Sequence, residues 1–186
     1  MQFRKNLCAA ICVGALGAWT FAVSAASVHS VMRCDAGMLL QFASSNIFSD
    51  NANAKEDIRQ TILKAASEHK RVLLDFGGNW CEDCQLLNLY FHDPGNASLL
   101  AQNYVVVDVS VGEYDRNLDI AQKYGIPLKL GVPAVVVLDG SGRVVYAQRN
   151  GEFEKMHLLN SAAVTAFLQK WKPTHAALVR KSRQTG

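Results

Sequence analysis

The sequence predicts an α/β domain in which a mixed β-sheet carries helices on both of its faces. Segments with helical and strand-like patterns alternate along most of the chain. Residues 71–76 read as a buried strand, and residues 104–109 form an unbroken β-branched run of the kind found in central parallel strands. Two later strand-like runs, residues 132–138 and 143–148, flank an Asp-Gly-Ser-Gly turn and form a hairpin. Alternation followed by a hairpin requires both parallel and antiparallel pairs in one sheet.

The composition is that of a globular protein with one core. The chain has 186 residues, of which 49% are hydrophobic and 19% are charged, and this length suffices for one domain. Thirteen glycines and four prolines without a repeating period exclude collagen-like and low-complexity chains. The formal net charge of +3, with no basic stripe interleaved with aromatic residues, argues against nucleic-acid binding.

The first half of the domain has the pattern of helix, strand and helix. A helix is predicted over residues 55–69, with Asn53 as its N-cap. Its apolar positions recur at helical spacing, and they are Ile58, Ile62, Ala65 and Ala66. The strand over residues 71–76 ends at two glycines. Residues 85–91 are apolar almost all round, which predicts a buried helix.

The second half alternates again before the hairpin. The strand over residues 104–109 is followed by a short helix over residues 117–124, which Gly125 and Pro127 end. After the hairpin, a last helix is predicted over residues 160–171. Its apolar positions are Val164, Phe167, Leu168 and Trp171. The complete order is therefore helix, strand, helix, strand, helix, strand, strand and helix.

The N-terminal residues have the pattern of a secretory signal peptide. Arg4 and Lys5 precede an uncharged apolar run, residues 6–28, which ends in small residues. We expect a cleaved leader over residues 1–26. The alternative is an uncleaved membrane anchor, because a run of about 20 apolar residues is sufficient to span a bilayer. Export would place the mature chain in the periplasm, an oxidising space where disulfides persist.

The remainder of the chain divides into three parts. Residues 27–53 are polar and irregular, and we expect no regular element before the first helix. Residues 54–172 contain all the predicted strands and helices and form the domain. Residues 173–186 carry basic side chains and no acid, which is typical of a solvated tail.

The cysteines are the unusual feature of this chain. A cleaved leader would remove Cys8 and Cys12, and the three that remain cannot all pair within one chain. Cys81 and Cys84 are too close in sequence to link distant parts of a fold, so their spacing indicates redox chemistry or metal binding. Cys34 is either buried and unreactive or forms an intermolecular or secondary disulfide, and the sequence leaves this open.

A zinc site and an inert structural disulfide are the alternatives to redox chemistry at this pair. Structural zinc takes four ligands, but no second pair of this spacing exists. Cys34, His69 and His92 are not spaced like zinc-finger ligands. We therefore expect no metal here.

The position of the pair at a predicted helix start favours electron transfer. Three residues make about one helical turn, so the two sulfurs can close a disulfide. The unpaired N–H groups and the dipole at a helix N-terminus stabilise a thiolate on Cys81. Cys81 is the predicted nucleophile toward a substrate disulfide, and Cys84 is the predicted resolving cysteine. No bound cofactor is needed, because the dithiol itself carries the electrons.

Three segments together resemble the thioredoxin superfamily. Residues 72–84, with the sequence VLLDFGGNWCEDC, resemble its active-site segment. Tyr124-Gly-Ile and the Gly-Val-Pro-Ala of residues 131–134 resemble its later cis-proline loop. The resemblance covers roughly residues 55–171. It is closer to exported thioredoxin-like proteins, and to the periplasmic C-terminal domain of the thiol:disulfide interchange protein, than to small cytosolic thioredoxins. The implied fold is a thioredoxin-like mixed sheet flanked by helices.

The resemblance implies roles for four further residues. Pro133 would be a cis-proline facing the cysteines, and the backbone of Val132 would meet an extended substrate strand. Asp75, within the first strand, would be the buried acid that accepts the proton of Cys84. Trp80 would pack beside the site and contact the substrate.

The chain departs from the family pattern next to the cysteines. The usual Gly-Pro dipeptide between them is Glu82-Asp83, and two acids in the first helical turn disfavour a thiolate on Cys81. We therefore expect a reducing rather than a strongly oxidising couple. The family's bulkier Trp-Ala is Gly77-Gly78 here, which suggests an open surface beside Cys81 for a larger partner.

Two departures lie further away. The lysine often found near the buried acid has no counterpart in residues 104–109, which weakens the proton-acceptor role of Asp75. Residues 127–130 form a short insertion before the cis-proline loop.

These observations predict a thiol–disulfide oxidoreductase of the cell envelope that reduces protein disulfides through Cys81 and Cys84. Its expected partners are protein disulfide or dithiol substrates and, by family analogy, a membrane electron donor; a monomer is expected. The alternative is a non-catalytic thioredoxin-fold protein that handles copper or assists assembly, with the cysteines as soft ligands.

Overall fold

The computed structural model describes residues 46–174. The predicted leader, Cys34, most of the irregular segment and nearly all of the basic tail lie outside the described residues. In chain order the helices and strands are α2 (Ala54–Ser67), β1 (Arg71–Gly77), α3 (Glu82–His92), α4 (Pro94–Asn103), β2 (Tyr104–Ser110), α5 (Leu118–Tyr124), β3 (Ala134–Leu138), β4 (Val144–Ala147) and α6 (Ser161–Trp171). Two short 3₁₀ turns are η1 (Leu128–Leu130) and η2 (Met156–Leu158).

The strands form one mixed sheet in the order β2-β1-β3-β4. β1 pairs parallel with β2 and antiparallel with β3, and β3 pairs antiparallel with β4. The predicted α/β mixed sheet is therefore confirmed. A parallel pair needs a helical crossover, and α3 and α4 provide it between β1 and β2.

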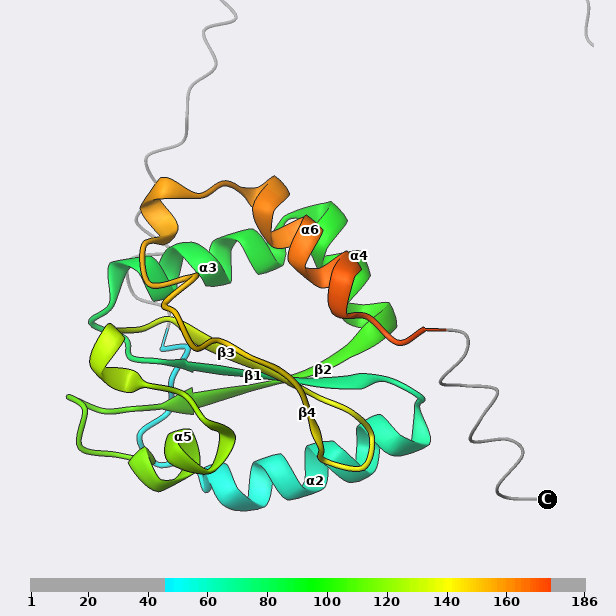
Figure 1. Ribbon diagram of the computed structural model, residues 1–186, viewed down its shortest axis with the longest axis horizontal. Coiled ribbons are helices and arrows are strands. Elements are labelled where there is room, and N and C mark those ends of the chain that lie inside the picture. Colours follow the sequence, from blue (N-terminus) through cyan, green and yellow to red (C-terminus); the bar gives the residue numbers. More distant parts are fainter. Residues whose placement is uncertain (1–45, 175–186) are drawn as a thin grey trace, which may run out of the picture. The chain divides into compact units, whose positions relative to one another are not determined.

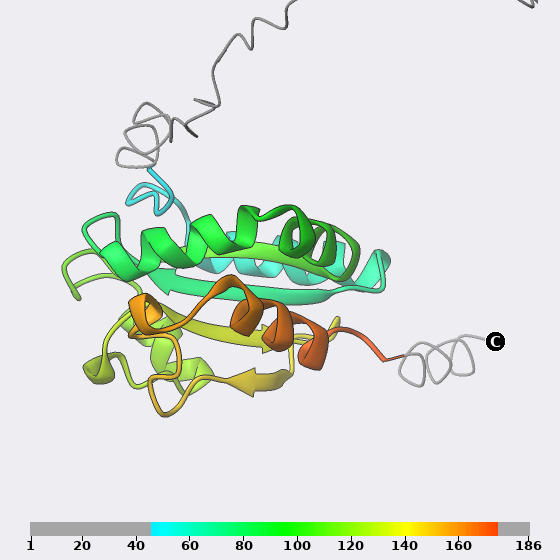
Figure 2. The same cartoon turned by 90° about the horizontal axis from the view of Figure 1, so that it is seen from above.

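Helices cover both faces of the sheet. α3, α4 and α6 lie on one face, and α2 and α5 lie on the other (Figure 1). The view from above shows α3 and α6 over the same face of the strands (Figure 2). Because side chains alternate along a strand, β1 contributes to a core on each side. Val72, Leu74 and Phe76 belong to the cluster beneath α2 and α5, and Leu73 belongs to the cluster beneath α3 and α6.

The structure adds α4, which the sequence pattern did not indicate. Pro94 occupies the first turn of this helix, and Gly95 follows it. Both residue types suggest a break in the chain, yet proline at the first helical position costs nothing, because its missing N–H would have no partner there. β3 begins at Ala134, two residues later than predicted, and the residues before it form a separate loop.

Residues 46–53, before α2, form no regular element, but they contribute to the core. Phe48 is completely buried against the cluster beneath α2. Its N–H donates to Asn79 Oδ1 at 3.0 Å, and Asn79 Nδ2 donates back to the Phe48 carbonyl at 2.8 Å. This reciprocal pair attaches the segment to the loop that carries the first cysteine.

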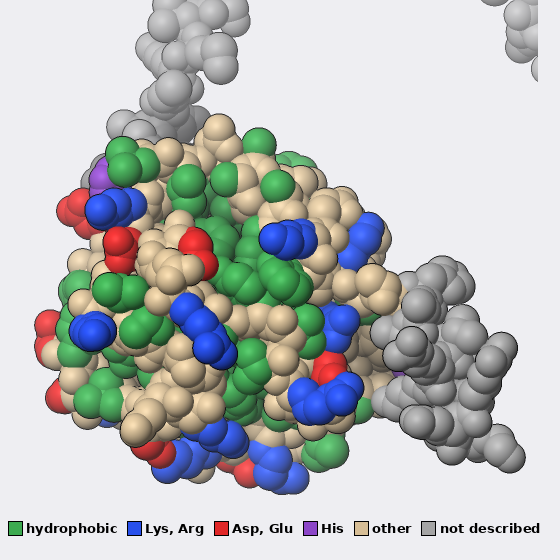
Figure 3. Space-filling view, in the orientation of Figure 1, with side chains coloured by type: hydrophobic (Ala, Val, Ile, Leu, Met, Phe, Trp, Pro, Cys, Tyr) green, Lys and Arg blue, Asp and Glu red, His purple; other side chains and the backbone are tan. Residues whose placement is uncertain are grey.

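Basic, acidic and apolar side chains are interspersed on the face of the molecule drawn in Figure 3. Within residues 46–174, none of the helices has the length and apolar character needed to cross a membrane.

Candidate active site

The two cysteines form a disulfide at the start of α3. Cys81 is the N-cap residue of this helix in an extended conformation, and its Sγ accepts the N–H of Cys84 at 3.0 Å. Their Cα atoms are 5.2 Å apart. Cys81 is 6% exposed, whereas Cys84 is fully buried. The cysteine with access to solvent is therefore the first of the pair, and its sulfur lies where the helix dipole favours negative charge.

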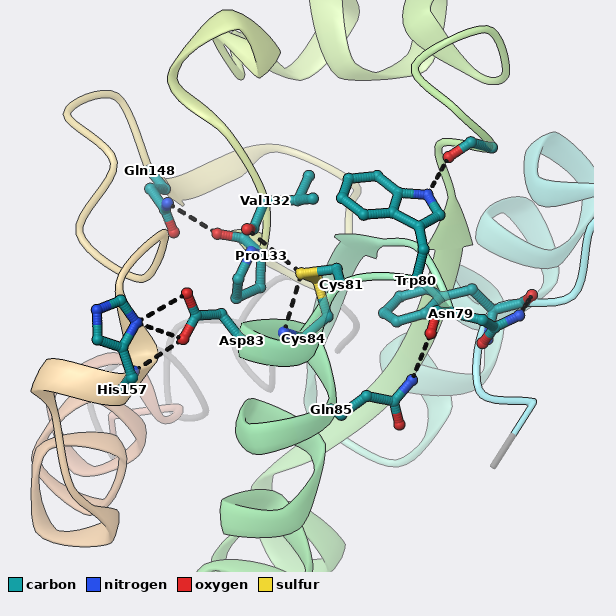
Figure 4. The surroundings of a disulfide bond; sticks show 12 residues. Asn79, Trp80, Cys81, Asp83, Cys84, Gln85, Val132, Pro133, Gln148 and His157 are labelled. Carbon is teal, nitrogen blue, oxygen red and sulfur yellow. Dashed lines mark hydrogen bonds and ion pairs between the residues drawn. A yellow bond between two sulfur atoms is a disulfide. The ribbon is translucent and has the colours of Figure 1, made fainter. Parts of the chain in front are cut away.

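The loop before β3 faces this disulfide. The Val132–Pro133 peptide bond is cis, the isomer that the family resemblance implies. Cys81 Sγ lies 3.5 Å from the carbonyl oxygen of Val132, and Pro133 stands beside the sulfurs (Figure 4). The structure thus brings these two predicted residues together with the cysteines, although they are 51 positions apart in sequence.

Gln148 holds this loop from behind, and the sequence did not single it out. Its side chain is 98% shielded from solvent and uses both ends of its amide. Nε2 donates to the Pro133 carbonyl at 3.0 Å, and Oε1 accepts the Val135 N–H at 3.3 Å. The only sequence signal for Gln148 is its position as a polar residue at the end of an apolar hairpin strand.

Trp80 lies on the surface next to Cys81 (Figure 4). Its side chain is 45% exposed, and its indole N–H donates to the Gly112 carbonyl at 2.8 Å. Its ring packs against Tyr114 with centroids 5.4 Å apart. Tyr114 in turn borders a pocket of about 490 Å³, which is further lined by Leu118, Leu128, Lys129, Leu130 and Gly131.

The open surface suggested by Gly77-Gly78 is absent, so that interpretation was wrong. A Cβ on Gly77 would collide with the ring of Phe48, and a Cβ on Gly78 would collide with the indole of Trp80. The rings of Phe48, which is distant in sequence, and of Trp80, in the same loop, fill the volume that a bulkier dipeptide would need. The glycines therefore allow close packing rather than an opening for a partner.

Asp75 is enclosed in the sheet beneath α3. It is 1% exposed, and its Oδ1 has no hydrogen-bond partner within residues 46–174. Its register partner on β2 is Asp108, whose side chain lies on the same face. Burial and the neighbouring Asp108 charge raise the pKa of Asp75 well above its ordinary value. Both effects favour the protonated form of the Asp75 carboxyl group.

Asp108 occupies the strand in which the family's lysine was missing. Partial desolvation of its carboxyl group raises the pKa of Asp108 to about 6, and the nearby His92 partly offsets that shift. A carboxylate here acts on Asp75 in the opposite direction from a lysine, because a like charge disfavours ionisation. A lone aspartate within an apolar strand was the sequence signal for this residue.

Replacing Asp75 by asparagine should flatten the pH dependence of stability in the oxidised protein. The folded pKa of Asp75 lies above the unfolded value of about 3.9, so the folded state holds a proton that the unfolded state releases. This stabilisation is complete below the unfolded pKa and is lost as the pH rises through the folded pKa. Between the two values it contributes a loss of about 1.4 kcal/mol per pH unit to the free energy of unfolding.

Urea unfolding of both proteins from about pH 4 to pH 9 measures this contribution. Asp75→Asn should gain stability relative to the wild type as the pH rises. Asp57→Asn, at an exposed position of α2, is the control and should keep the wild-type slope. A pH-independent difference between Asp75→Asn and the wild type would contradict the assignment.

No group of three or more His, Cys, Asp or Glu side chains in the described part of the chain is arranged to hold a metal ion.

A Cys-x-x-Cys disulfide at a helix start, opposite a cis-proline on a mixed sheet, defines a thioredoxin-like oxidoreductase fold. A family model described as thioredoxin-like matches residues 53–140. The crystal structure of a disulphide isomerase from Xylella fastidiosa Temecula1 is 33% identical, with a TM-score of 0.65, over 68% of this chain and 96% of that one. The chain therefore belongs to the thioredoxin superfamily.

Two thiol:disulfide interchange proteins, both named DsbD, are also similar. The protein from Colwellia psychrerythraea is 25% identical over 126 residues, or 62% of this chain. The protein from Vibrio vulnificus is 30% identical over 92 residues, or 48% of this chain. The matched regions make up 20% and 15% of the lengths of these relatives.

Proposed function

We propose that this protein is a thiol–disulfide oxidoreductase of the cell envelope that reduces disulfides in other proteins. The observation that carries the proposal is the Cys81–Cys84 disulfide, placed at the N-terminus of α3 with Cys81 Sγ against the cis-proline loop. A disulfide that closes only one helical turn adds little to stability, because it constrains a very short loop. Its placement at a helix dipole instead favours reversible opening.

The exchange proceeds in two steps. The Cys81 thiolate attacks one sulfur of the substrate disulfide, forming a mixed disulfide and releasing the other substrate sulfur as a thiolate. Cys84 then gives its proton to Asp75, in molecules in which that carboxyl group is ionised, and attacks Cys81 Sγ. The mixed disulfide breaks, the second substrate sulfur leaves, and the Cys81–Cys84 disulfide closes. Two electrons pass to the substrate, and its two thiolates take up protons from water.

The surface around Cys81 is suited to a polypeptide substrate. Val132 presents its backbone beside the sulfur in the cis-proline loop, so an extended strand can align there. Pro133 forms the wall of the loop, and the exposed Trp80 ring supplies apolar contact on the other side. These contacts recognise backbone and apolar surface, which suits a range of unfolded or extended segments.

The dithiol must be regenerated after each turnover. A membrane electron donor is the proposed reductant, on the analogy of relatives that are named as thiol:disulfide interchange proteins. The leader pattern of residues 1–26 supports export to the periplasm, with residues 54–172 as the working domain and residues 173–186 as a tail. We propose that the protein acts as a monomer without a bound cofactor.

Trapping tests the proposal. Cys84→Ser removes the resolving thiol, so the mixed disulfide through Cys81 cannot be released. In cells that export the protein, this variant should accumulate covalent adducts that dithiothreitol cleaves by reduction. Mass spectrometry of the adducts then identifies the substrates. The control is the double variant Cys81→Ser, Cys84→Ser, which should form none. Absence of adducts with the single variant would refute the proposed activity on protein disulfides.

A further inference from the structure

The acid between the two cysteines has a partner from a distant part of the chain. Asp83 accepts the backbone N–H of His157 at 2.8 Å through Oδ1. The ring Nδ1 of His157 lies 2.9 Å from Oδ1 and 3.1 Å from Oδ2 (Figure 4). Because a carboxylate only accepts hydrogen bonds, Nδ1 carries the proton of this contact. Two donors of one residue thus converge on one carboxylate.

η2 holds His157 in this position. Met156, the first residue of η2, is completely buried in the core beneath α3 and α6. The side chain of His157 itself is 61% exposed, and that of Asp83 is 21% exposed. The ring is therefore placed by its backbone rather than by packing, so its removal leaves the core intact.

The neighbouring acid has no such partner. Glu82 is exposed in the same first turn of α3, and its side chain makes no hydrogen bond or ion pair within residues 46–174. The two acids next to Cys81 therefore differ, although both stand at the N-terminus of the helix, where they compete with a thiolate for its dipole. The negative charge of Asp83 is offset by the two N–H donors of His157. The negative charge of Glu82 is offset only by solvent.

We propose that His157 is a positioning residue of the redox couple, which holds Asp83 so that its carboxylate opposes the Cys81 thiolate less strongly. A stabilised thiolate shifts the thiol–disulfide equilibrium toward the dithiol. His157 thereby sets how readily the protein is reduced and how fast Cys81 attacks. The inference rests on the proposed function only in taking Cys81 as the nucleophile.

A double-mutant cycle between His157 and Asp83 tests the proposal. The readout is the pH midpoint of thiolate formation at Cys81 in the reduced protein, taken from the rate of alkylation by iodoacetamide. H157A should raise this midpoint, so that the thiolate fraction below it falls about threefold, the typical effect of a charge at a helix terminus. H157N keeps a donor at the Nδ1 position and should retain most of the wild-type value. D83N should lower the midpoint, and H157A should have little further effect in the D83N background.

A second cycle provides the matched control. E82Q removes the acid that lacks a partner, so its effect should add to that of H157A without coupling. Glutathione equilibria at pH 8 should show the H157A disulfide favoured by about the same threefold factor, with the difference shrinking at high salt. An unchanged midpoint in H157A, or a shift that persists fully with D83N, would overturn the proposal. Alkylation needs no substrate protein, so this failure is distinct from a failure to trap adducts.

Discussion

Replacing Cys81 by serine should lower disulfide-reductase turnover by about a thousandfold or more, to the rate of the reductant alone. The thiolate is the nucleophile in exchange, and a serine hydroxyl at the same N-cap position stays protonated at neutral pH. The variant should still fold, because serine is a preferred N-cap residue and can accept the N–H of Cys84 as Cys81 Sγ does. The measurement is the rate of reduction of a disulfide-containing protein with dithiothreitol in excess.

The serine variants of the two cysteines should lose activity at different steps of the exchange. Cys84→Ser should also lose turnover, but it should react once and stop at the mixed disulfide, because Cys81 remains on the accessible side of the pair. Cys81→Ser should form no such adduct. Substantial turnover by Cys81→Ser, or adducts through Cys84 instead of Cys81, would reverse the assigned roles.

Replacing Phe48 by alanine should cost about 3–5 kcal/mol of stability, the usual loss for a buried aromatic ring. The ring is completely buried and lies over Gly77. Because Gly77 has no side chain, it cannot fill the cavity that Phe48→Ala would leave. Urea unfolding of the oxidised protein measures the loss. Leu63→Ala, at a leucine that is 57% exposed on α2, is the control, and it should change stability by less than about 0.5 kcal/mol.

Phe48→Ala also shows how much residues 46–53 contribute to the fold. Phe48 exchanges two hydrogen bonds with Asn79, two residues before Cys81. A loss below about 1 kcal/mol for Phe48→Ala would mean that the segment before α2 contributes little to the fold. The description of this segment as part of the core would then be wrong.

Much of the fold could be predicted from local pattern. The apolar runs at residues 71–76 and 104–109 correspond to β1 and β2. An unbroken apolar run of this length is sufficient to recognise a buried parallel strand. The hairpin turn placed β3 beside β4. Helix α4 was missed because Pro94 and Gly95 resemble a break, and only packing against the sheet shows that a helix starts there.

The chemistry of the site was predictable where it is local, and less so where it is tertiary. Cys81 and Cys84 lie one helical turn apart. Their spacing indicated redox chemistry or metal binding, and their position at a predicted helix start favoured redox chemistry. Gln148 and His157 act across 15 and 74 positions of sequence, through contacts that exist only in the folded chain. Periodicity gives no information on such pairs. Asp108 was visible in the sequence, but its effect on the buried acid follows from the strand register.

In the proposed reaction, Cys81 and Cys84 pass electrons to a protein disulfide by closing their own disulfide. The most direct measurement mixes the reduced wild-type protein with one equivalent of an oxidised substrate protein, quenches with acid, alkylates free thiols and weighs both proteins. Each substrate disulfide lost should be matched by one Cys81–Cys84 disulfide gained, without an added cofactor. A substrate that stays oxidised beside the reduced protein, or one that is reduced while both cysteines remain thiols, would contradict it.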